Sequence, residues 1–198
     1  MRRQKPGDNG FSLLELLLTC GLVVTLSAAA IPQTLAGLDD ARARAAARHV
    51  AGRVQWARLQ AAARGRSVGL RFESDGSGGY RCMAYVDGNH DGIRTRDIQQ
   101  GIDAGLGTPE RLGDLFAGAQ FGLATDVPPV GATRPDGDPN PIRLGRSAIL
   151  SVGATGTTTS GTLYVRAGRA QLAVRLLGAT GRARVMVFDR ATRSWRPE

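Results

Sequence analysis

The sequence predicts an α+β protein, in which one long N-terminal helix packs on an antiparallel β-sheet domain. Residues 11–66 form one continuous helical stretch, which is apolar in its first half and amphipathic in its second. After residue 66, short strand-like runs recur between glycine-rich turns, a pattern typical of antiparallel sheets. Because strands and helices do not alternate repeatedly, the order of one helix followed by strands favours the α+β class over a parallel α/β fold.

Length and composition narrow the possible classes of protein. With 198 residues, 42% of them hydrophobic, the chain is long enough for one domain with an appended element and is not wholly disordered. Its net charge of +9 is divided unevenly along the chain. Residues 42–72 hold eight arginines and no acid, residues 73–138 hold eleven acids against five arginines, and residues 139–198 hold ten arginines against two acids. With no recognisable nucleophile, phosphate-binding or metal-ligand spacing, we expect no enzyme and no required cofactor.

Residues 1–10 are a short basic leader, and residues 11–38 are almost entirely apolar or small. The apolar segment exceeds the roughly 20 residues needed to cross a bilayer. Arg2, Arg3 and Lys5 precede it, so the positive-inside rule places the N-terminus in the cytoplasm. The segment runs without a break into a helical pattern, whereas a secretory signal has a shorter apolar core and a cleavage site after it. We therefore expect a retained, single-pass anchor.

Glu15 is the exception within the apolar segment. A carboxylate in hydrocarbon costs about 2.5–3.5 kcal/mol on insertion scales unless it is paired or protonated. One explanation is an acid that reaches the membrane interface near the helix start, where the helix dipole favours negative charge. The other explanation is a partner supplied by another molecule.

The string Gly10-Phe11-Ser12-Leu13-Leu14-Glu15 resembles the class III signal of type IV pilins and pseudopilins, whose usual form is glycine followed by Phe-Thr-Leu-Ile-Glu. The proline at position 32 also matches many family members, which carry a kink there. The resemblance implies that a prepilin peptidase cuts after Gly10 and that the new amine of Phe11 is N-methylated. It also implies that Glu15 pairs with the Phe11 amine of a neighbouring subunit during assembly.

Residues 39–66 are predicted to continue the helix outside the membrane and to end near Gly65. Small and apolar residues recur on one face with a period of 3.6, which favours packing on a sheet. The members of this stripe are Ala43, Ala46, Ala47, Val50, Ala51, Val54, Ala57 and Ala61. Trp56 and Leu59 point away from the stripe, so they are either simply exposed or in contact with neighbouring filament subunits.

Residues 67–198 form the predicted sheet domain. Strands are expected at 67–73, 80–86, 148–152, 162–166, 170–177 and 182–189, and an acidic insert rich in Gly, Asp and Pro occupies residues 87–141. This order of strands, with a late Gly-Arg-x-Arg turn, is similar to the domain shared by the minor pseudopilin GspH of type II secretion and the minor pilin FimT.

The insert contains Asp87, Asn89 and Asp91, followed by Gly92. Oxygen-bearing side chains at positions one, three and five before a glycine open an EF-hand-type calcium loop. The twelfth position is Ile98, where a glutamate is needed, and Asp97 comes one place too early. The sequence thus leaves two interpretations, a Ca²⁺ site with Asp97 as the last ligand, or a turn-rich loop whose Asp and Asn side chains bind their own backbone.

The C-terminal region carries Arg182, Arg184, Arg190, Arg193 and Arg196, with Trp195 among them. Basic residues beside an aromatic residue suit a surface that binds phosphates and stacks bases. In FimT-like minor pilins, a Gly-Arg-x-Arg motif at this position is associated with DNA capture. The alternative is that the glycine and arginines of this turn only shape a hairpin, as in the secretion-type relatives.

Taken with the resemblance, these features predict a minor pseudopilin of the type II secretion system. It would be inserted in the bacterial inner membrane with its sheet domain in the periplasm, and it would join a pseudopilus with other pseudopilins after processing. The alternative function is a FimT-like minor pilin that binds DNA during natural transformation.

Overall fold

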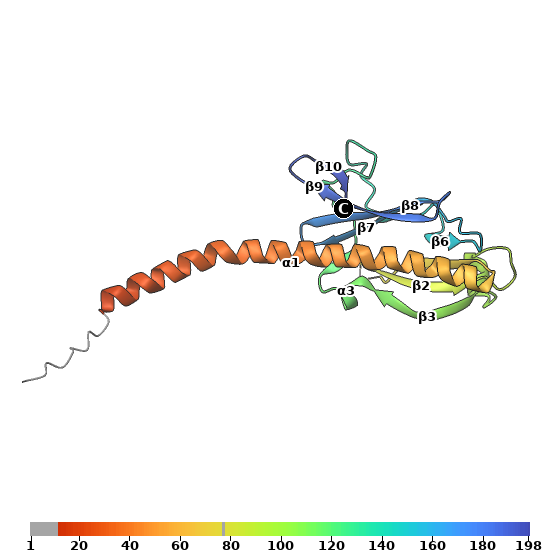
Figure 1. Cartoon of the computed structure of the whole chain (residues 1–198), viewed down its shortest axis with the longest axis horizontal. Helices are drawn as coiled ribbons and strands as arrows, with labels where there is room; N and C mark the ends of the chain where they lie inside the picture. The colour runs from red at the N-terminus through yellow and green to blue at the C-terminus, as the bar shows by residue number, and fades with distance from the viewer. Residues whose placement is uncertain (1–11, 77) are drawn as a thin grey trace, which may run out of the picture. The chain divides into compact units, whose positions relative to one another are not determined.

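The computed structural model describes residues 12–76 and 78–198, and the chain divides into two compact units, Met1–Gly37 and Leu38–Glu198. The leader 1–10 and the residues Gly10 and Phe11 lie outside the described residues. A single helix, α1 (Leu13–Arg64), begins in the first unit and ends in the second (Figure 1). It stops at Gly65, whose φ of +62° lies in the left-handed region that a glycine adopts without strain. The predicted long helix and its end are therefore confirmed.

Within the described residues, ten strands follow α1, and every pairing between them is antiparallel. The first sheet has the order β3-β2-β1-β6, and the second has the order β10-β9-β8-β7-β4 with β5 paired to β7. The strands are β1 (Val68–Ser74), β2 (Tyr80–Val86), β3 (Ala104–Arg111), β4 (Ala119–Phe121), β5 (Ile142–Arg143), β6 (Ile149–Val152), β7 (Gly161–Ala167), β8 (Ala170–Leu177), β9 (Arg182–Asp189) and β10 (Ser194–Pro197). The α+β class is confirmed, and all six expected strands are present within one residue at each end.

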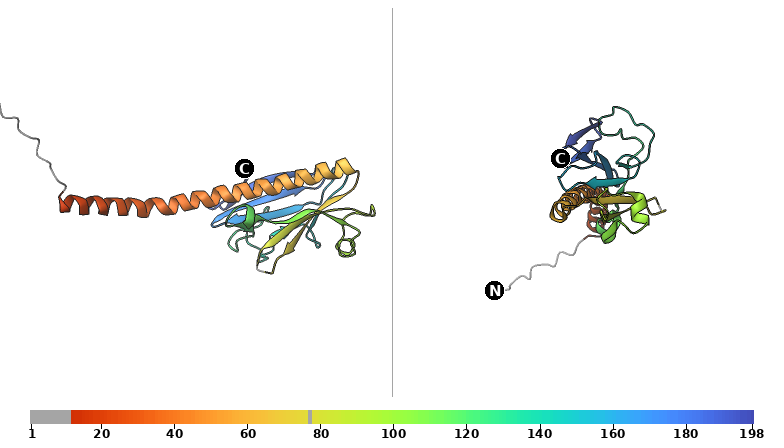
Figure 2. Two further views of the ribbon diagram at one scale, coloured as in Figure 1. Left: turned by 90° about the horizontal axis from the view of Figure 1, so that it is seen from below. Right: turned by 90° about the vertical axis from the view of Figure 1, so that its right-hand side faces the viewer.

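The second half of α1 lies along both sheets, as two views of the ribbon show (Figure 2). Its predicted stripe is buried: Ala43, Ala46, Ala47, Val54, Ala57 and Ala61 are fully inaccessible, Val50 is 4% exposed, and Ala51 is partly buried. These side chains join the inward faces of both sheets in one hydrophobic core. Small residues let the helix approach the strands closely, which explains why the stripe is mostly alanine.

The expectation that Trp56 points away from the core is wrong. Its ring is half-buried and packs against the core, and the Arg53 guanidinium lies 4.3 Å from the ring centroid. A large aromatic side chain beside a stripe of alanines reaches the sheet that the smaller residues only approach. Leu59 remains 70% exposed, as expected.

The acidic insert, residues 87–141, contains short helices and strands that its sequence did not indicate. These elements are α2 (Thr95–Gln99), strand β3, α3 (Leu112–Leu115) and strand β4, and a long loop over residues 122–141 follows them. Strand β3 contains Gly105, Gly107 and Pro109 and is largely exposed, so it carries no apolar alternation. It is a strand because it pairs with β2, with an irregular register between Cys82 and Ala84. Tertiary pairing here overrides local propensity.

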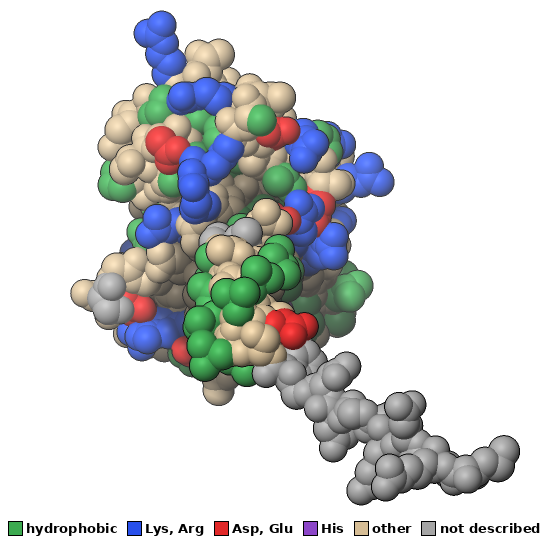
Figure 3. All heavy atoms as spheres, turned by 90° about the vertical axis from the view of Figure 1, so that its left-hand side faces the viewer, with side chains coloured by type: hydrophobic (Ala, Val, Ile, Leu, Met, Phe, Trp, Pro, Cys, Tyr) green, Lys and Arg blue, Asp and Glu red, His purple; other side chains and the backbone are tan. Residues whose placement is uncertain are grey.

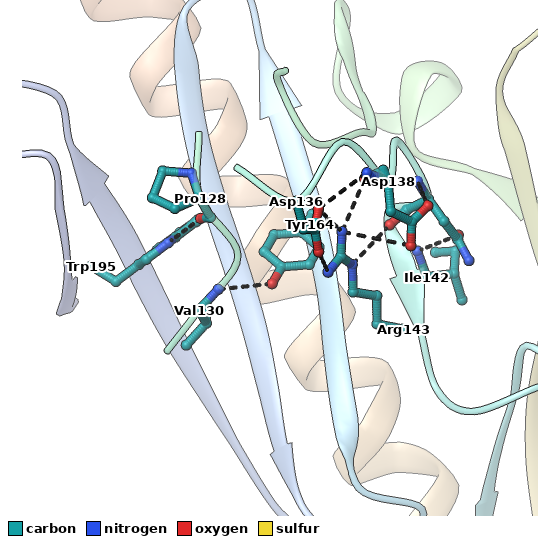
Figure 4. Close-up of polar contacts among 9 residues, drawn as sticks. Pro128, Val130, Asp136, Asp138, Ile142, Arg143, Tyr164 and Trp195 are labelled. Atoms are coloured by element: carbon teal, nitrogen blue, oxygen red, sulfur yellow. Dashed lines mark hydrogen bonds and ion pairs between the residues drawn. The ribbon is translucent and has the colours of Figure 1, made fainter. Parts of the chain in front are cut away.

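The loop 122–141 covers the face of the second sheet that points away from α1. It forms a second, smaller core with the sheet, made of Leu123, Val127, Tyr164, Ala173 and Phe188. Two side chains fasten the loop (Figure 4). The Tyr164 hydroxyl accepts a hydrogen bond from the Val130 N–H at 2.9 Å, and the Trp195 Nε1 donates to the Pro128 carbonyl at 2.8 Å. The loop is therefore packed in place by sheet residues.

Candidate functional site

The apolar half of α1 exposes its large side chains all around the helix. Leu13, Leu17, Leu22, Val24 and Ile31 are between 56% and 79% exposed, and an 18-residue window of this helix has a mean hydropathy of 2.1. Figure 3 shows hydrophobic side chains gathered on the surface of this segment. One helix near the N-terminus is thus long and apolar enough to span a membrane. An exposed apolar surface of this extent marks a membrane or protein contact.

The three threonines of this segment bind its own backbone. The hydroxyls of Thr19 and Thr25 donate to carbonyls three residues earlier at 2.9 Å, and the hydroxyl of Thr34 donates to Ala30 at 3.0 Å. Such internal bonds are what an apolar surrounding requires of a polar group. Glu15 lies in the first turn of α1 and, among the described residues, has no ion-pair or hydrogen-bond partner. Its carboxylate is therefore free to bind another molecule.

The loop after β2 contains three buried carboxylates, Asp87, Asp97 and Asp103. Asp87 accepts hydrogen bonds from the backbone N–H groups of Asn89, His90 and Gly92 at 3.2, 2.7 and 2.9 Å. Asp103 accepts the N–H groups of Gly88 and Arg94, both at 3.1 Å. A buried carboxylate needs such donors, and these bonds let Asp87 and Asp103 hold the loop together.

The structure does not bring the four expected calcium ligands into one coordination group. Asp91 pairs with Arg94 at 2.7 Å, and the Asp97 Oδ1 accepts a hydrogen bond from Arg96 at 3.3 Å, while its buried Oδ2 has no hydrogen-bond partner. Within residues 12–76 and 78–198, no group of three or more His, Cys, Asp or Glu residues is placed to hold a metal ion. Asn89 donates its backbone N–H to Asp87 and accepts that of Asp91. The geometry favours the self-bonded loop, and calcium binding stays an untested prediction.

The five C-terminal arginines do not share one free surface. Arg190 pairs with Asp126, and its Nε donates to the Arg169 carbonyl at 3.1 Å. Arg196 lies 3.8 Å from Asp189 and stands opposite Val187, a core residue, on the face of the sheet toward α1. Arg193 is exposed in the turn before β10 with a φ of +50°. Only Arg182 and Arg184 share a face of β9, and both are exposed.

Position 181 can be occupied only by glycine. Its φ is +60°, and a Cβ there would lie 2.5 Å from the Gly156 carbonyl oxygen and 2.8 Å from the Arg58 Nε. The glycine of the Gly-Arg-x-Arg turn therefore shapes the β8–β9 hairpin. The arginines that follow it are a separate feature. Neither Arg182 nor Arg184 has a carboxylate within ion-pair distance in the described chain.

Arg143 binds two aspartates on the face of the second sheet that points away from α1 (Figure 4). Its guanidinium bonds Asp136 through two nitrogens, at 2.5 and 3.1 Å, and lies 5.6 Å from the centroid of the Tyr164 ring. The hydrogen bond from Arg143 lowers the pKa of Asp136, and burial raises the pKa of Tyr164. This arginine is neutralised, unlike Arg182 and Arg184.

A fourth cluster joins α1 to the first sheet, and the sequence alone did not indicate it. Glu110 of β3 lies 3.2 Å from the His49 Nε2 and 3.4 Å from the Arg53 Nε, above the buried thiol of Cys82. Burial raises the pKa of Cys82 to about 12. Both cysteines, Cys20 and Cys82, are free. The partners lie 61 and 57 residues apart in sequence, so no local spacing could reveal them.

No family model, no curated protein and no solved structure matches this chain.

Proposed function

We propose that the chain is a minor pseudopilin, an assembly subunit of a type II secretion pseudopilus. The observation that carries the proposal is the order of its parts. A Gly10-Phe11 cleavage signal stands before Glu15, at the head of an exposed apolar helix that leads into an α+β unit. Prepilin peptidase would cut after Gly10 and methylate Phe11, with the helix held in inner-membrane lipid and the globular unit in the periplasm.

The free-energy cost of placing the Glu15 carboxylate in an apolar segment supports a role in assembly. An acid five residues into an apolar segment is unfavourable unless a partner offsets its desolvation. The Phe11 amine of a neighbouring subunit is an opposite charge that only processing creates. In a low-dielectric bundle of helices the two charges attract far more strongly than in water. The partners of this subunit are then other pseudopilins.

Cross-linking in a cell with a working secretion system tests this proposal. A photo-reactive residue in place of Leu17 or Leu22, on the exposed apolar surface, should cross-link to co-expressed pseudopilins. The same residue in place of Leu59, which lies in the globular unit, serves as a comparison. Cross-links that form equally in a host without prepilin peptidase would contradict the proposal.

A DNA-binding minor pilin is the second candidate. The observation that favours it is the exposed pair Arg182 and Arg184, which have no acidic partner in the described chain. Duplex DNA would bind with little sequence preference and with a steep loss of affinity in salt. Retention of DNA at about 150 mM salt, where charges are screened beyond about 8 Å, would favour this function if Arg182→Gln and Arg184→Gln abolish it. Because the other C-terminal arginines are partly neutralised, we expect weak DNA binding.

A further inference from the structure

The edge of the second sheet is open at the start of β9. Strand β10 pairs with residues 186–189 of β9 only, and the Glu198 N–H then bonds the Val185 carbonyl at 3.2 Å. No described strand pairs with Arg182, Ala183 and Arg184 on this side. Alternate residues of an antiparallel strand direct their backbone N–H and C=O groups to opposite neighbours. The backbone groups of Ala183 therefore point the same way as the Val185 carbonyl, into the open edge.

A groove of about 770 Å³ runs along this edge. Its lining combines the strand with one polar residue of α1 and with the chain end; the residues are Gln55, Leu177, Thr180, Arg182, Ala183, Arg184, Val185, Pro197 and Glu198. Leu177 is 39% exposed and the Ala183 side chain is half-buried against the core. The groove thus offers free backbone groups beside small apolar side chains.

The two arginines that line the groove have no acidic partner among the described residues, because the one acid in the lining, Glu198, is paired with Arg44 and Arg48. Arg184 stands directly opposite Arg175 of β8, and Arg182 stands opposite Leu177 on the same face. Directly opposed like charges destabilise a sheet. Among the described residues, none of these three arginines has a carboxylate within 4.0 Å. An acidic partner would remove this repulsion.

We propose that this edge binds an extended segment of another protein, with acidic residues at alternate positions and an uncharged residue between them. The segment adds a strand to β9, and its backbone bonds the N–H and C=O of Ala183. Two of its carboxylates stand beside Arg182 and Arg184 on one face, because residues two apart on a strand share a face. The uncharged residue faces the side of Val185 and Gln55.

The occupant comes from another chain because this chain's own acidic pairs are engaged. Two segments carry acids two residues apart, Glu73–Asp75 and Asp136–Asp138. Arg71 and Arg111 hold the first pair at 2.9 and 3.3 Å, and Arg143 holds the second at 2.5 and 3.7 Å. A protein segment also suits the site better than DNA, because DNA has no use for the free backbone groups of Ala183. The proposal does not depend on the pseudopilin assignment.

Binding of a short end-blocked peptide of alternating Glu and Val to the full chain in detergent micelles tests the inference. We expect saturable binding, together with new protection of the Ala183 amide against hydrogen exchange. The double variant Arg182→Gln, Arg184→Gln should weaken binding by at least about tenfold, or about 1.4 kcal/mol. The matched control, Arg146→Gln with Arg169→Gln, removes the same charge from exposed positions outside the groove and should bind normally.

Two further measurements distinguish binding by strand addition from binding by charge attraction alone. A peptide N-methylated at its valine amides, which face β9 when the carboxylates stand beside Arg182 and Arg184, cannot pair with β9 and should lose its affinity. Ala183→Pro removes the outward N–H but not a ladder bond to β8, and it should weaken the unmodified peptide. If Ala183→Pro fails to fold, the methylated peptide still tests backbone pairing, because it changes the peptide and not the protein.

The proposal is overturned if the Glu-Val peptide does not bind at millimolar concentration, or if it binds the double variant equally well. It is also overturned if the methylated peptide binds as tightly and Ala183 stays unprotected. Binding of duplex DNA through Arg182 and Arg184, without peptide binding, would instead assign the edge to polyanions.

Discussion

Arg175 and Arg184 stand directly opposite each other on the adjacent antiparallel strands β8 and β9. Their Cβ atoms are close neighbours in any such pair, so the two guanidinium groups repel each other, and neither has a carboxylate within 4.0 Å among the described residues. The opposed arginines lower the stability of the sheet, and they leave a positively charged surface on it. The relationship links the energetics of the fold to the proposed binding edge.

Arg184→Glu should therefore stabilise the protein while it removes binding at the edge. Replacing repulsion by an opposite-charge pair is expected to add about 0.2–1 kcal/mol to the free energy of unfolding. Arg175→Glu should do the same, and the double variant should return to the original stability because it restores like charges. Thermal unfolding of the four proteins measures this cycle, and additive effects of the two changes would contradict it.

Asp87 is predicted to be structural. Asp87→Ala leaves three partly buried backbone N–H groups without their acceptor and should cost about 2–4 kcal/mol. The control Asp91→Ala breaks a partly exposed pair with Arg94 and should cost less than about 1 kcal/mol. For each variant, thermal unfolding should give the same cost in millimolar calcium as in a chelator. A calcium-dependent rise in melting temperature that Asp91→Ala abolishes would instead support the calcium interpretation.

Cys82 gives a pH-dependent prediction. Burial raises the pKa of its thiol to about 12, whereas the pKa of a thiol in an unfolded chain is about 8.5. The raised pKa adds stability that is fully present below about pH 8.5 and is lost as the pH rises towards 12. Denaturant unfolding between about pH 9 and about pH 11 should show a loss of up to about 1.4 kcal/mol per pH unit relative to Cys82→Ala.

A Cys20→Ser background isolates the Cys82 thiol for a chemical check of the same burial. The folded protein should resist alkylation near neutral pH and react once denatured, because the thiolate is the reactive form. Fast alkylation of the folded protein, or an identical pH slope in Cys82→Ala, would show that the thiol is not held protonated.

Glu15→Val should leave membrane insertion intact and slightly favoured, because it removes the cost of an acid in the apolar segment. Incorporation into filaments should fall, since the amine of the neighbouring Phe11 loses its partner. Glu15→Asp is the matched control, because it keeps the charge on a shorter side chain and should retain part of the incorporation. Recovery of the subunit in sheared filaments, compared with its amount in membranes, measures both effects. Unchanged incorporation of Glu15→Val would contradict the pairing.

Local patterns were sufficient to predict the helix and most of the strands. The alanine and valine stripe of α1 identified the buried face because the core imposes a 3.6-residue period on any helix it covers. The strands from β6 to β9, and the pair β1 and β2, showed apolar runs between glycine turns. Strand β3 could not be found in this way, because an exposed edge strand with two glycines and a proline has no apolar pattern.

The candidate sites divide similarly. Glu15 and the apolar helix could be predicted from the sequence, because a single carboxylate within an apolar segment can be recognised without a structure. Arg175 was missed, since its role depends on the register that places it opposite Arg184. The contact of Glu198 with Arg48, at 2.7 Å, joins residues 150 positions apart and has no local signal. Conversely, the five C-terminal arginines are close in sequence, but strand alternation and ion pairs separate them in the fold.

The N-terminus of the mature protein tests the central claim most directly. The full chain should be expressed in a host with an active prepilin peptidase, extracted from membranes and measured by intact and peptide mass spectrometry. We predict a chain that begins at N-methylated Phe11, and a Gly10 variant with a large side chain that keeps its leader. A wild-type chain that retains Met1 in that host would contradict the pseudopilin assignment.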